Sequence, residues 1–159
     1  MAKTINQRMT ARLEGDFVVF LIGMRINRPW KIHKWLPVAM GMPAMLKELE
    51  GKPESGFLGA MQGITFLVQY WRSFAHLEAY AKDREGKHFP AWQKFNRRVR
   101  SNGDVGIWHE SYLVKDGTYE NIYNNMPPHG LGKIGKLVPA SGKYEFAAGR
   151  KDWDKDAAP

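Results

Sequence analysis

Cysteine is absent from this chain of 159 residues. Disulfide bonds, thiolate metal sites and cysteine nucleophiles are therefore excluded. Long apolar runs are lacking as well, because no stretch approaches the ~18 consecutive apolar residues that a membrane helix needs. The segment from Met1 to Asp16 is polar and charged and has no apolar stretch of the kind that marks a secretory signal. We therefore expect a cytoplasmic protein that does not enter a membrane.

Acidic residues are in the minority, since 24 Lys and Arg face 16 Asp and Glu, for a formal net charge of +8. Such a balance is typical of proteins that bind nucleic acid. Here, however, the basic residues are dispersed along the chain. The one dense cluster, Arg97, Arg98 and Arg100, fits an exposed helix end, where cations complement the helix dipole. We therefore do not expect a nucleic-acid partner.

The hydrophobic pattern predicts four strands and three helical regions in a chain that is 43% hydrophobic. Strands are expected where apolar, β-branched and aromatic residues run together, and helices where apolar residues recur every three or four positions. Pro37 and Pro43 predict that the first helical region is kinked or divided. The predicted strands are 17–26, 57–62, 64–71 and 105–114, and the predicted helices are 30–49, 74–83 and 89–99.

This order of elements is that of a split βαββαβ unit, which gives a ferredoxin-like α+β fold with an antiparallel sheet and helices on one face. The other face needs a cover, from a second copy or from an extension of the chain. We expect a mobile N-terminal arm (1–15), a ferredoxin-like domain (16–123) and a C-terminal extension (124–159) that wraps the core. A half-covered antiparallel sheet also predicts a homodimer.

Specific catalytic signatures are absent: there is no P-loop, no GxGxxG after a strand, no HExxH and no nucleophile elbow. Histidines are the remaining candidates for catalysis, at positions 33, 76, 88, 109 and 129. His88 is spaced from Trp92, Phe95 and Val99 so that the imidazole heads one apolar helix stripe. The alternative for His88 is an exposed or capping residue in the first turn of the helix.

His109 lies in the strand 105–114, on the same face as Ile107 and Leu113. An imidazole among apolar side chains is costly unless it is hydrogen-bonded or has a use. Two interpretations therefore stay open: a core histidine bonded to a neighbour such as Ser111, or a general acid or base. The remaining histidines fit ordinary surface positions.

Most of the chain, from Phe17 to about Gly142, resembles a family of small bacterial and fungal monooxygenase-like proteins related to a fumagillin-pathway enzyme. The resemblance is carried by FVVFLIGMRINRPWK, YWRSFAHLEAYA, GKHFPAWQKFN, GIWHESY and YNNMPPHGLG. It implies a dimeric α/β barrel but says little about which reaction the protein catalyses.

A second, shorter resemblance is to the C-terminal half of haem-containing aldoxime dehydratases. It is carried by WRSF at 71–74, Leu77-Glu78, Tyr80, His88 and WHE at 108–110. It implies that His88 is the axial ligand of haem b iron and that His109 is the distal acid–base group. The residues expected to bind the cofactor are His88, Trp92, Phe95, Ile107 and Leu113, with Arg72 or Lys87 at the propionates.

The sequence departs from the dehydratases in one respect: those proteins contain two ferredoxin-like halves in one chain, whereas this chain has one, so that a homodimer would supply the second. The leading prediction is a haem-dependent enzyme that performs oxidative or dehydrative chemistry on a small apolar substrate. Three alternatives stay open. They are an aldoxime dehydratase-like haem lyase, a cofactor-free monooxygenase-like barrel in which His109, Trp108 and Tyr112 contact the substrate, and a non-enzymatic small-molecule binder.

Overall fold

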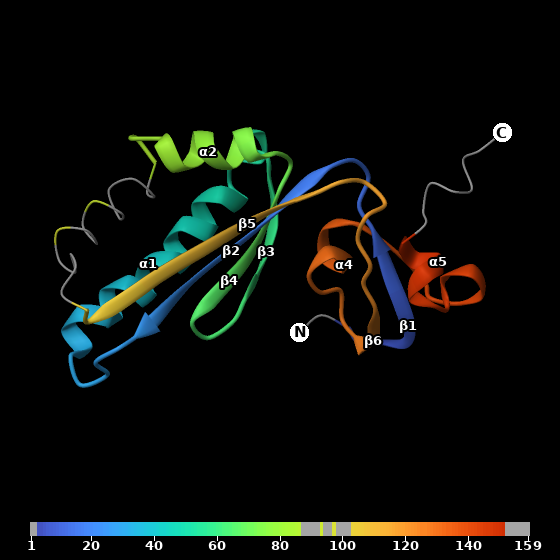
Figure 1. Ribbon diagram of the computed structural model, residues 1–159, viewed down its shortest axis with the longest axis horizontal. Helices are drawn as coiled ribbons and strands as arrows, with labels where there is room; N and C mark the ends of the chain where they lie inside the picture. The colour runs from blue at the N-terminus through green and yellow to red at the C-terminus, as the bar shows by residue number, and fades with distance from the viewer. Residues whose placement is uncertain (1–2, 87–92, 94–96, 98–102, 152–159) are drawn as a thin grey trace. The chain divides into compact units, whose positions relative to one another are not determined.

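The chain folds as two units, which are described separately below (Figure 1). The computed structural model describes residues 3–86, 93, 97 and 103–151. One unit comprises Val18–Tyr112, and the other comprises Met1–Phe17 together with Leu113–Pro159. Among the described residues, no helix is both long enough and apolar enough to cross a membrane.

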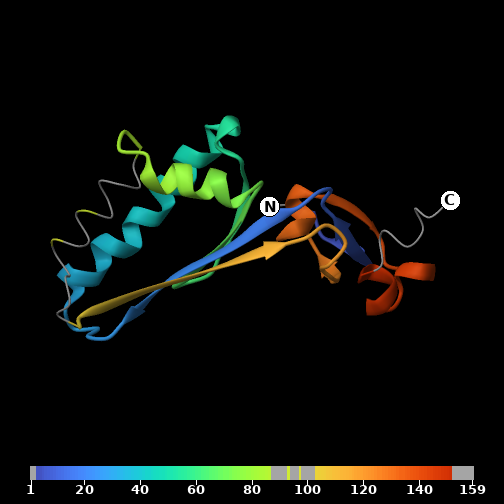
Figure 2. The same cartoon turned by 45° about the horizontal axis from the view of Figure 1, so that its top comes forward.

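The unit Val18–Tyr112 is built on a four-stranded sheet with the order β3-β4-β2-β5. Pairing of β2 with β4 and of β3 with β4 is antiparallel. Figure 2 shows the helices α1 and α2 on the same side of this sheet. The predicted ferredoxin-like α+β fold is therefore confirmed. The elements are β2 (Phe17–Ile26), α1 (Ile32–Glu50), a short 3-10 helix η1 (Pro53–Ser55), β3 (Phe57–Gln62), β4 (Phe66–Trp71), α2 (Phe74–Lys82) and β5 (Val105–Val114).

Three of the predicted strands have the bounds expected from the sequence, while the fourth, β4, begins two residues late. Gly63 and Phe66 close a turn there, since Gly63 N donates to Phe66 O at 2.8 Å, and Ile64 within the turn is 98% exposed. The helix α1 is continuous through Pro37 and Pro43, where the sequence predicted a kink or a division. The predicted helix 89–99 lies outside the described residues, apart from positions 93 and 97.

The core of this unit lies between the sheet and the helices. It consists of Val18, Leu49, Trp71 and Leu77, with Phe20, Phe57 and Tyr80 packed against it. Trp71 is fully buried, and its ring contacts the rings of Phe57 and Tyr80 at centroid distances of 5.3 and 5.6 Å. Val18 and Phe20 of β2 and Trp71 of β4 belong to this core, so their side chains point toward the helices. Because side chains alternate along a strand, every second residue of β2 and of β4 lies on the same helix-facing side of the sheet.

A buried carboxylate joins the start of α1 to the start of β5. Asp104 is 2% exposed and accepts hydrogen bonds from Lys31 Nζ at 2.9 Å and from Arg28 at 3.0 Å. The hydrogen bond from Lys31, helped by the charge of Arg28, lowers the pKa of Asp104 from its usual value. The first turn of α1 has no acidic residue and no capping side chain. Asp104 therefore anchors the start of α1, which has no capping side chain of its own.

The other unit contains a three-stranded antiparallel sheet with the order β6-β1-β7. Residues 5–12 form its central strand, β1 (Ile5–Arg12), where the sequence predicted a mobile arm. The predicted C-terminal extension likewise contains short regular elements. These are β6 (Tyr123–Met126), α4 (Leu131–Ile134), β7 (Lys136–Pro139), the 3-10 helix η2 (Gly142–Tyr144) and α5 (Ala147–Lys151).

Side chains that follow β5 explain why the N-terminal segment is ordered. Tyr119 Oη accepts a hydrogen bond from Leu13 N at 2.6 Å and donates one to Leu13 O at 2.9 Å. The amide of Asn121 does the same for Ala11, at 2.7 and 2.9 Å. The backbone of residues 11–13 therefore finds its partners more than a hundred positions away, which a search for local patterns does not reveal.

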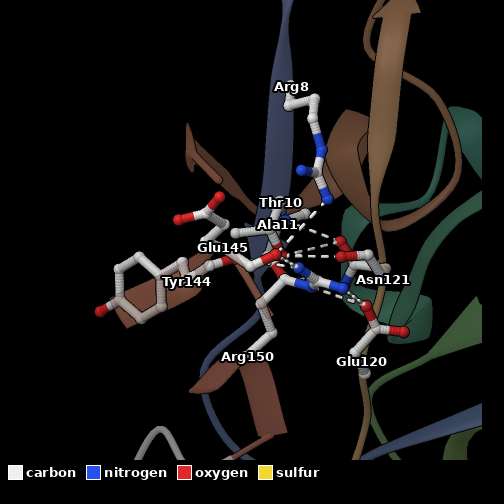
Figure 3. A network of polar contacts seen from close by, with 8 residues as sticks. All are labelled: Arg8, Thr10, Ala11, Glu120, Asn121, Tyr144, Glu145 and Arg150. Atoms are coloured by element: carbon white, nitrogen blue, oxygen red, sulfur yellow. Dashed lines mark hydrogen bonds and ion pairs between the residues drawn. The ribbon is translucent and has the colours of Figure 1, made fainter. Parts of the chain in front are cut away.

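The last helix is held by a buried arginine (Figure 3). Arg150 is 6% exposed, and its Nε donates to Glu120 Oε1 at 2.6 Å. Its Nη1 donates to the backbone oxygens of Tyr144 and Glu145 at 3.0 and 2.7 Å. One side chain thus satisfies carbonyls at the end of η2 and links α5 to residue 120.

Candidate functional site

The imidazole of His109 lies on the helix-facing side of the sheet, in contact with Phe20. The two ring centroids are 5.6 Å apart and the planes are tilted by 42°. Phe20 packs against the buried core cluster, which places His109 on the same side as α1 and α2. The predicted face is therefore correct. The side chain is exposed, however, as is Ile107 at 41%, so the described chain does not bury this imidazole as the sequence predicted.

A buried amide, Gln69, stands on the same side of the sheet. Gln69 is 8% exposed and lies directly opposite Phe20 in the pairing of β4 with β2. Trp71 Nε1 donates a hydrogen bond to Gln69 Oε1 at 3.0 Å. Because β2 lies between β4 and β5, Phe20 separates the amide from the imidazole of His109.

Apolar side chains remain exposed on the helix that covers this side of the sheet. Ile32, Leu36 and Met40 recur every four residues along α1 and are 54%, 41% and 68% exposed. Residues four apart share one helix face. Within the part of the chain that the structure describes, this apolar row has no complete cover.

Two further predicted site residues, Arg72 and Leu113, lie in the described part of the chain. Arg72 is exposed and directly follows β4, one position before the N-cap of α2. Leu113 is 71% exposed and belongs to the other unit. His88, the expected axial ligand, and the expected slot residues Trp92 and Phe95 lie outside the described residues.

The opposite face of the sheet carries a second group of aromatic side chains. The indole of Trp108 lies over Gly23, so closely that a Cβ at residue 23 would be 2.7 Å from three atoms of the ring. Phe66 pairs with Gly23 from the other side. Phe66 and Trp108 are 46% and 41% exposed. Only a residue without a side chain allows the indole to lie flat on β2 at this position.

Tyr112 and Glu110 lie further along the same face of β5 as Trp108. Tyr112 Oη donates a hydrogen bond to Glu110 Oε2 at 2.7 Å. This hydrogen bond raises the pKa of the Tyr112 phenol, because the carboxylate favours the protonated form. Both side chains are exposed, so this face of β5 carries a polar pair next to the apolar Trp108.

The other described histidines do not extend the site. His76 Nδ1 is 2.7 Å from Ser73 Oγ, at the start of α2, and its ring fills the space over Gly56. His33 and His129 are exposed, as the sequence predicted. Within the described ranges there is no group of three or more His, Cys, Asp or Glu that could hold a metal ion.

Sequence reasoning missed Gln69 and Phe20. The signal for Gln69 was present, because it is the one polar side chain in the strand FLVQYW. A polar residue in an otherwise apolar strand is buried only where it is hydrogen-bonded or used. Phe20 carried no such signal, since it is one of many apolar residues in β2.

Comparison with known proteins places most of the chain in one sequence family. The family described as Monooxygenase af470-like matches residues 17–131. The curated protein Monooxygenase af470 of Aspergillus fumigatus is 30% identical over 157 aligned residues, which cover 84% of this chain and 56% of that protein. This chain therefore spans about half the length of the curated relative.

A solved structure of an aldoxime dehydratase shares the fold. It superposes with a TM-score of 0.61 at 14% sequence identity, covering 87% of this chain and 45% of the dehydratase. At this identity the likeness concerns the fold and not the reaction. Here too, the chain matches about half of a longer protein.

Proposed function

This chain belongs to the monooxygenase af470-like family, and we propose that it is a haem-binding enzyme of that family which acts on a small apolar substrate. In this proposal His88 is the axial ligand of haem b, and His109 is the distal acid–base group. The observation that carries the proposal is the exposed imidazole of His109 beside Phe20, on the side of the sheet that α1 and α2 cover.

The described residues fit a flat apolar group. Haem needs an axial imidazole, an apolar slot and cations for its propionates. Phe20 and Ile107 offer apolar surface next to His109, and Arg72 is an exposed cation at the end of β4. The roles of His88, Trp92 and Phe95 rest on the resemblance to haem-containing aldoxime dehydratases alone.

Bound haem would supply a redox-active iron with an open coordination position. The chain's own contribution in this proposal is proton transfer. An imidazole can give a proton to a leaving group or donate a hydrogen bond to a polar ligand, and this is the role that we propose for His109. Phe20 contacts the imidazole ring from one side.

A dehydratase reaction is the second candidate, and the fold shared with an aldoxime dehydratase favours it. In that reaction an aldoxime loses water to give a nitrile. His109 would protonate the departing hydroxyl group, and the oxime carbon would lose its hydrogen as a proton. Conversion of phenylacetaldoxime to phenylacetonitrile by the haem-loaded protein, and its loss in His109→Ala, would support this candidate over an oxidative one.

We further propose that the enzyme works as a homodimer joined through the face of the sheet that α1 and α2 leave open. A solvated antiparallel sheet alternates apolar and polar residues, but β2 reads FVVFLIGMRI, apolar on both faces until Arg25. Phe66 and Trp108 flank Gly23 on this open face. The longer relatives, of which this chain spans about half, have room for a second such unit in one chain.

Light scattering coupled to size-exclusion chromatography tests the dimer. Wild-type protein should elute with twice the mass of the chain, and Trp108→Lys should be monomeric. Trp30→Lys is the matched control, because Trp30 is 73% exposed and lies before α1. A monomeric wild type, or a Trp108→Lys variant as dimeric as the control, would refute the proposed interface.

Titration with haemin tests the cofactor. The absorbance of the wild type should show a Soret band that saturates at about one haem per chain. His88→Ala should weaken or shift this band, whereas the control His76→Ala should leave it unchanged, because His76 is occupied by Ser73 and Gly56. Equal spectra for wild type and His88→Ala would remove His88 as axial ligand and favour the cofactor-free alternative.

A further inference from the structure

The start of α1 carries an excess of positive charge. The stretch 17–47, which forms β2 and most of α1, contains no acidic residue. Asp104 accepts hydrogen bonds from both Arg28 and Lys31, and a single carboxylate balances only one of these two cations. The cations of the stretch are Arg25, Arg28, Lys31, Lys34 and Lys47.

An apolar row runs along α1 from this cationic end. Ile32, Leu36 and Met40 follow one another at intervals of four residues and are 54%, 41% and 68% exposed. Lys47 comes seven positions after Met40, so it continues the same helix face with an exposed cation. The core-facing side of the helix is a different one, since it carries the buried Leu49. The exposed face of α1 is therefore apolar in the middle and cationic toward both ends of the row.

A tryptophan stands where the row begins. Trp30 is 73% exposed and lies two positions before the first residue of α1. The loop that carries it is held to the helix, because Trp35 Nε1 donates a hydrogen bond to Pro29 O at 2.9 Å. Tryptophan is enriched at the boundary between membrane and water, where its apolar ring and its polar N–H both find suitable surroundings.

This combination of charge and apolar surface matches the surface of an anionic lipid bilayer. Helices that lie in the plane of such a surface bury an apolar face at the acyl boundary and place Lys and Arg among the lipid phosphates. Cations alone would suit nucleic acid as well, but the row Ile32, Leu36 and Met40 offers no contact to a phosphate backbone, which is bound by polar and charged groups. The charge and the apolar row together therefore favour lipid.

We propose that α1 is an interfacial helix, which rests on an anionic lipid surface through Trp30 and the row Ile32, Leu36 and Met40. The cations of the stretch 17–47 bind the lipid phosphates. Such a helix lies on the membrane and does not cross it, in keeping with the finding that no described helix could span one. Neither haem nor the proposed dimer enters this argument.

Co-sedimentation with lipid vesicles tests the apolar row. Wild-type protein should pellet with vesicles of equal parts phosphatidylglycerol and phosphatidylcholine, stay in solution with phosphatidylcholine alone, and be released by salt, which screens charges. Met40→Gln should weaken binding about 5- to 30-fold, since it removes an apolar side chain that is partly buried in lipid. Ile64→Gln is the matched control and should bind as the wild type does, because Ile64 is equally apolar but lies in the turn before β4.

A second pair of variants tests the charge. Lys47→Gln should weaken binding to the mixed vesicles about fivefold, the contribution expected of one cation near an anionic membrane. Lys133→Gln is the control, because Lys133 is also an exposed lysine in the last turn of a helix but belongs to the other unit. Equal losses for Lys47→Gln and Lys133→Gln would show attraction by net charge alone and would overturn the proposal.

The remaining outcomes decide between lipid and other occupants of the row. Failure of the wild type to pellet with the mixed vesicles, equal pelleting with phosphatidylcholine, or a Met40→Gln variant that binds like Ile64→Gln would each overturn the proposal. A lower urea midpoint for Met40→Gln than for Ile64→Gln would show that the chain itself covers the row. A change from dimer to monomer in light scattering of Met40→Gln would assign the row to a second copy, and either result would also overturn the proposal.

Discussion

Replacing Trp71 by phenylalanine isolates the hydrogen bond on which the orientation of Gln69 depends. Trp71 is fully buried, and its indole nitrogen donates a hydrogen bond to the Gln69 side-chain oxygen. Phenylalanine keeps an aromatic ring between Phe57 and Tyr80. It removes the donor and leaves the oxygen of a buried amide without a partner.

The expected loss has two parts. An unpartnered buried acceptor costs about 1–3 kcal/mol. The smaller ring also leaves a cavity, which at ~24 cal/mol per Å³ adds roughly 1 kcal/mol for a void of about 40 Å³. We therefore expect Trp71→Phe to lower the free energy of unfolding by about 2–4 kcal/mol.

Urea unfolding followed by circular dichroism measures this loss. The control is Trp30→Phe, which should change the free energy of unfolding by less than about 0.5 kcal/mol because Trp30 is 73% exposed. In a double-mutant cycle, Trp71→Phe and Gln69→Met should be non-additive, since the second change removes the acceptor that the first leaves unpartnered. A loss no larger than that of the control, or strict additivity, would refute the hydrogen bond and the orientation of Gln69 derived from it.

Three further changes test other parts of the structure. Arg150→Met should lower the free energy of unfolding by about 1–3 kcal/mol, because Glu120 and the Tyr144 carbonyl lose the donor Arg150 and the Glu145 carbonyl keeps only the longer contact with Arg8. Urea unfolding that matches the wild type would contradict this. Asp104→Asn should lower the thermal midpoint at pH 7. Because the pKa of Asp104 is lowered in the folded protein, its stabilisation is present above the usual value of 3.8 and is lost as the pH falls below it, so the midpoints of wild type and variant should converge under acid conditions. A constant difference across pH would speak against the ion pairs. Gly23→Val should displace Trp108, shift its fluorescence to the red and destabilise the sheet by about 1–3 kcal/mol, and an unchanged emission spectrum would show that the indole does not lie on residue 23.

The fold of the unit Val18–Tyr112 was largely predictable from local patterns. β2 and β5 are continuous apolar or alternating runs bounded by turn residues, and Ser73 caps α2 as its position before FAHLEAYAK indicates. The start of β4 was misplaced because Ile64 is β-branched and apolar, yet lies in a turn closed by Gly63. The strand propensity of single residues does not reveal a turn that is fixed by a backbone hydrogen bond.

The N-terminal strand was not predictable in the same way. β1 reads INQRMTAR, which is largely polar and has no clear alternation. Its order comes from pairing with β6 and β7 and from the side chains of Tyr119 and Asn121, all far along the chain. Such long-range partners leave no trace in a window of ten residues.

The candidate site was predictable only in part. Alternation in β5 correctly placed His109 and Ile107 on one face and Trp108 on the other. The contact with Phe20 and the buried amide of Gln69 depend on the register between strands, which the sequence of a single strand does not contain. The expected axial ligand, His88, stays a prediction that rests on resemblance.

Chemical rescue of a cavity variant tests the haem ligand most directly. In His88→Gly the side chain of the proposed axial ligand is removed, and free imidazole can take its place. We predict that haemin binds this variant weakly, and that added imidazole restores a Soret band with the position and the haem-to-chain ratio of the wild type, while His76→Gly needs no rescue. A His88→Gly variant that binds haemin as the wild type does, with no response to imidazole, would contradict the assignment of His88 and with it the haem site proposed here.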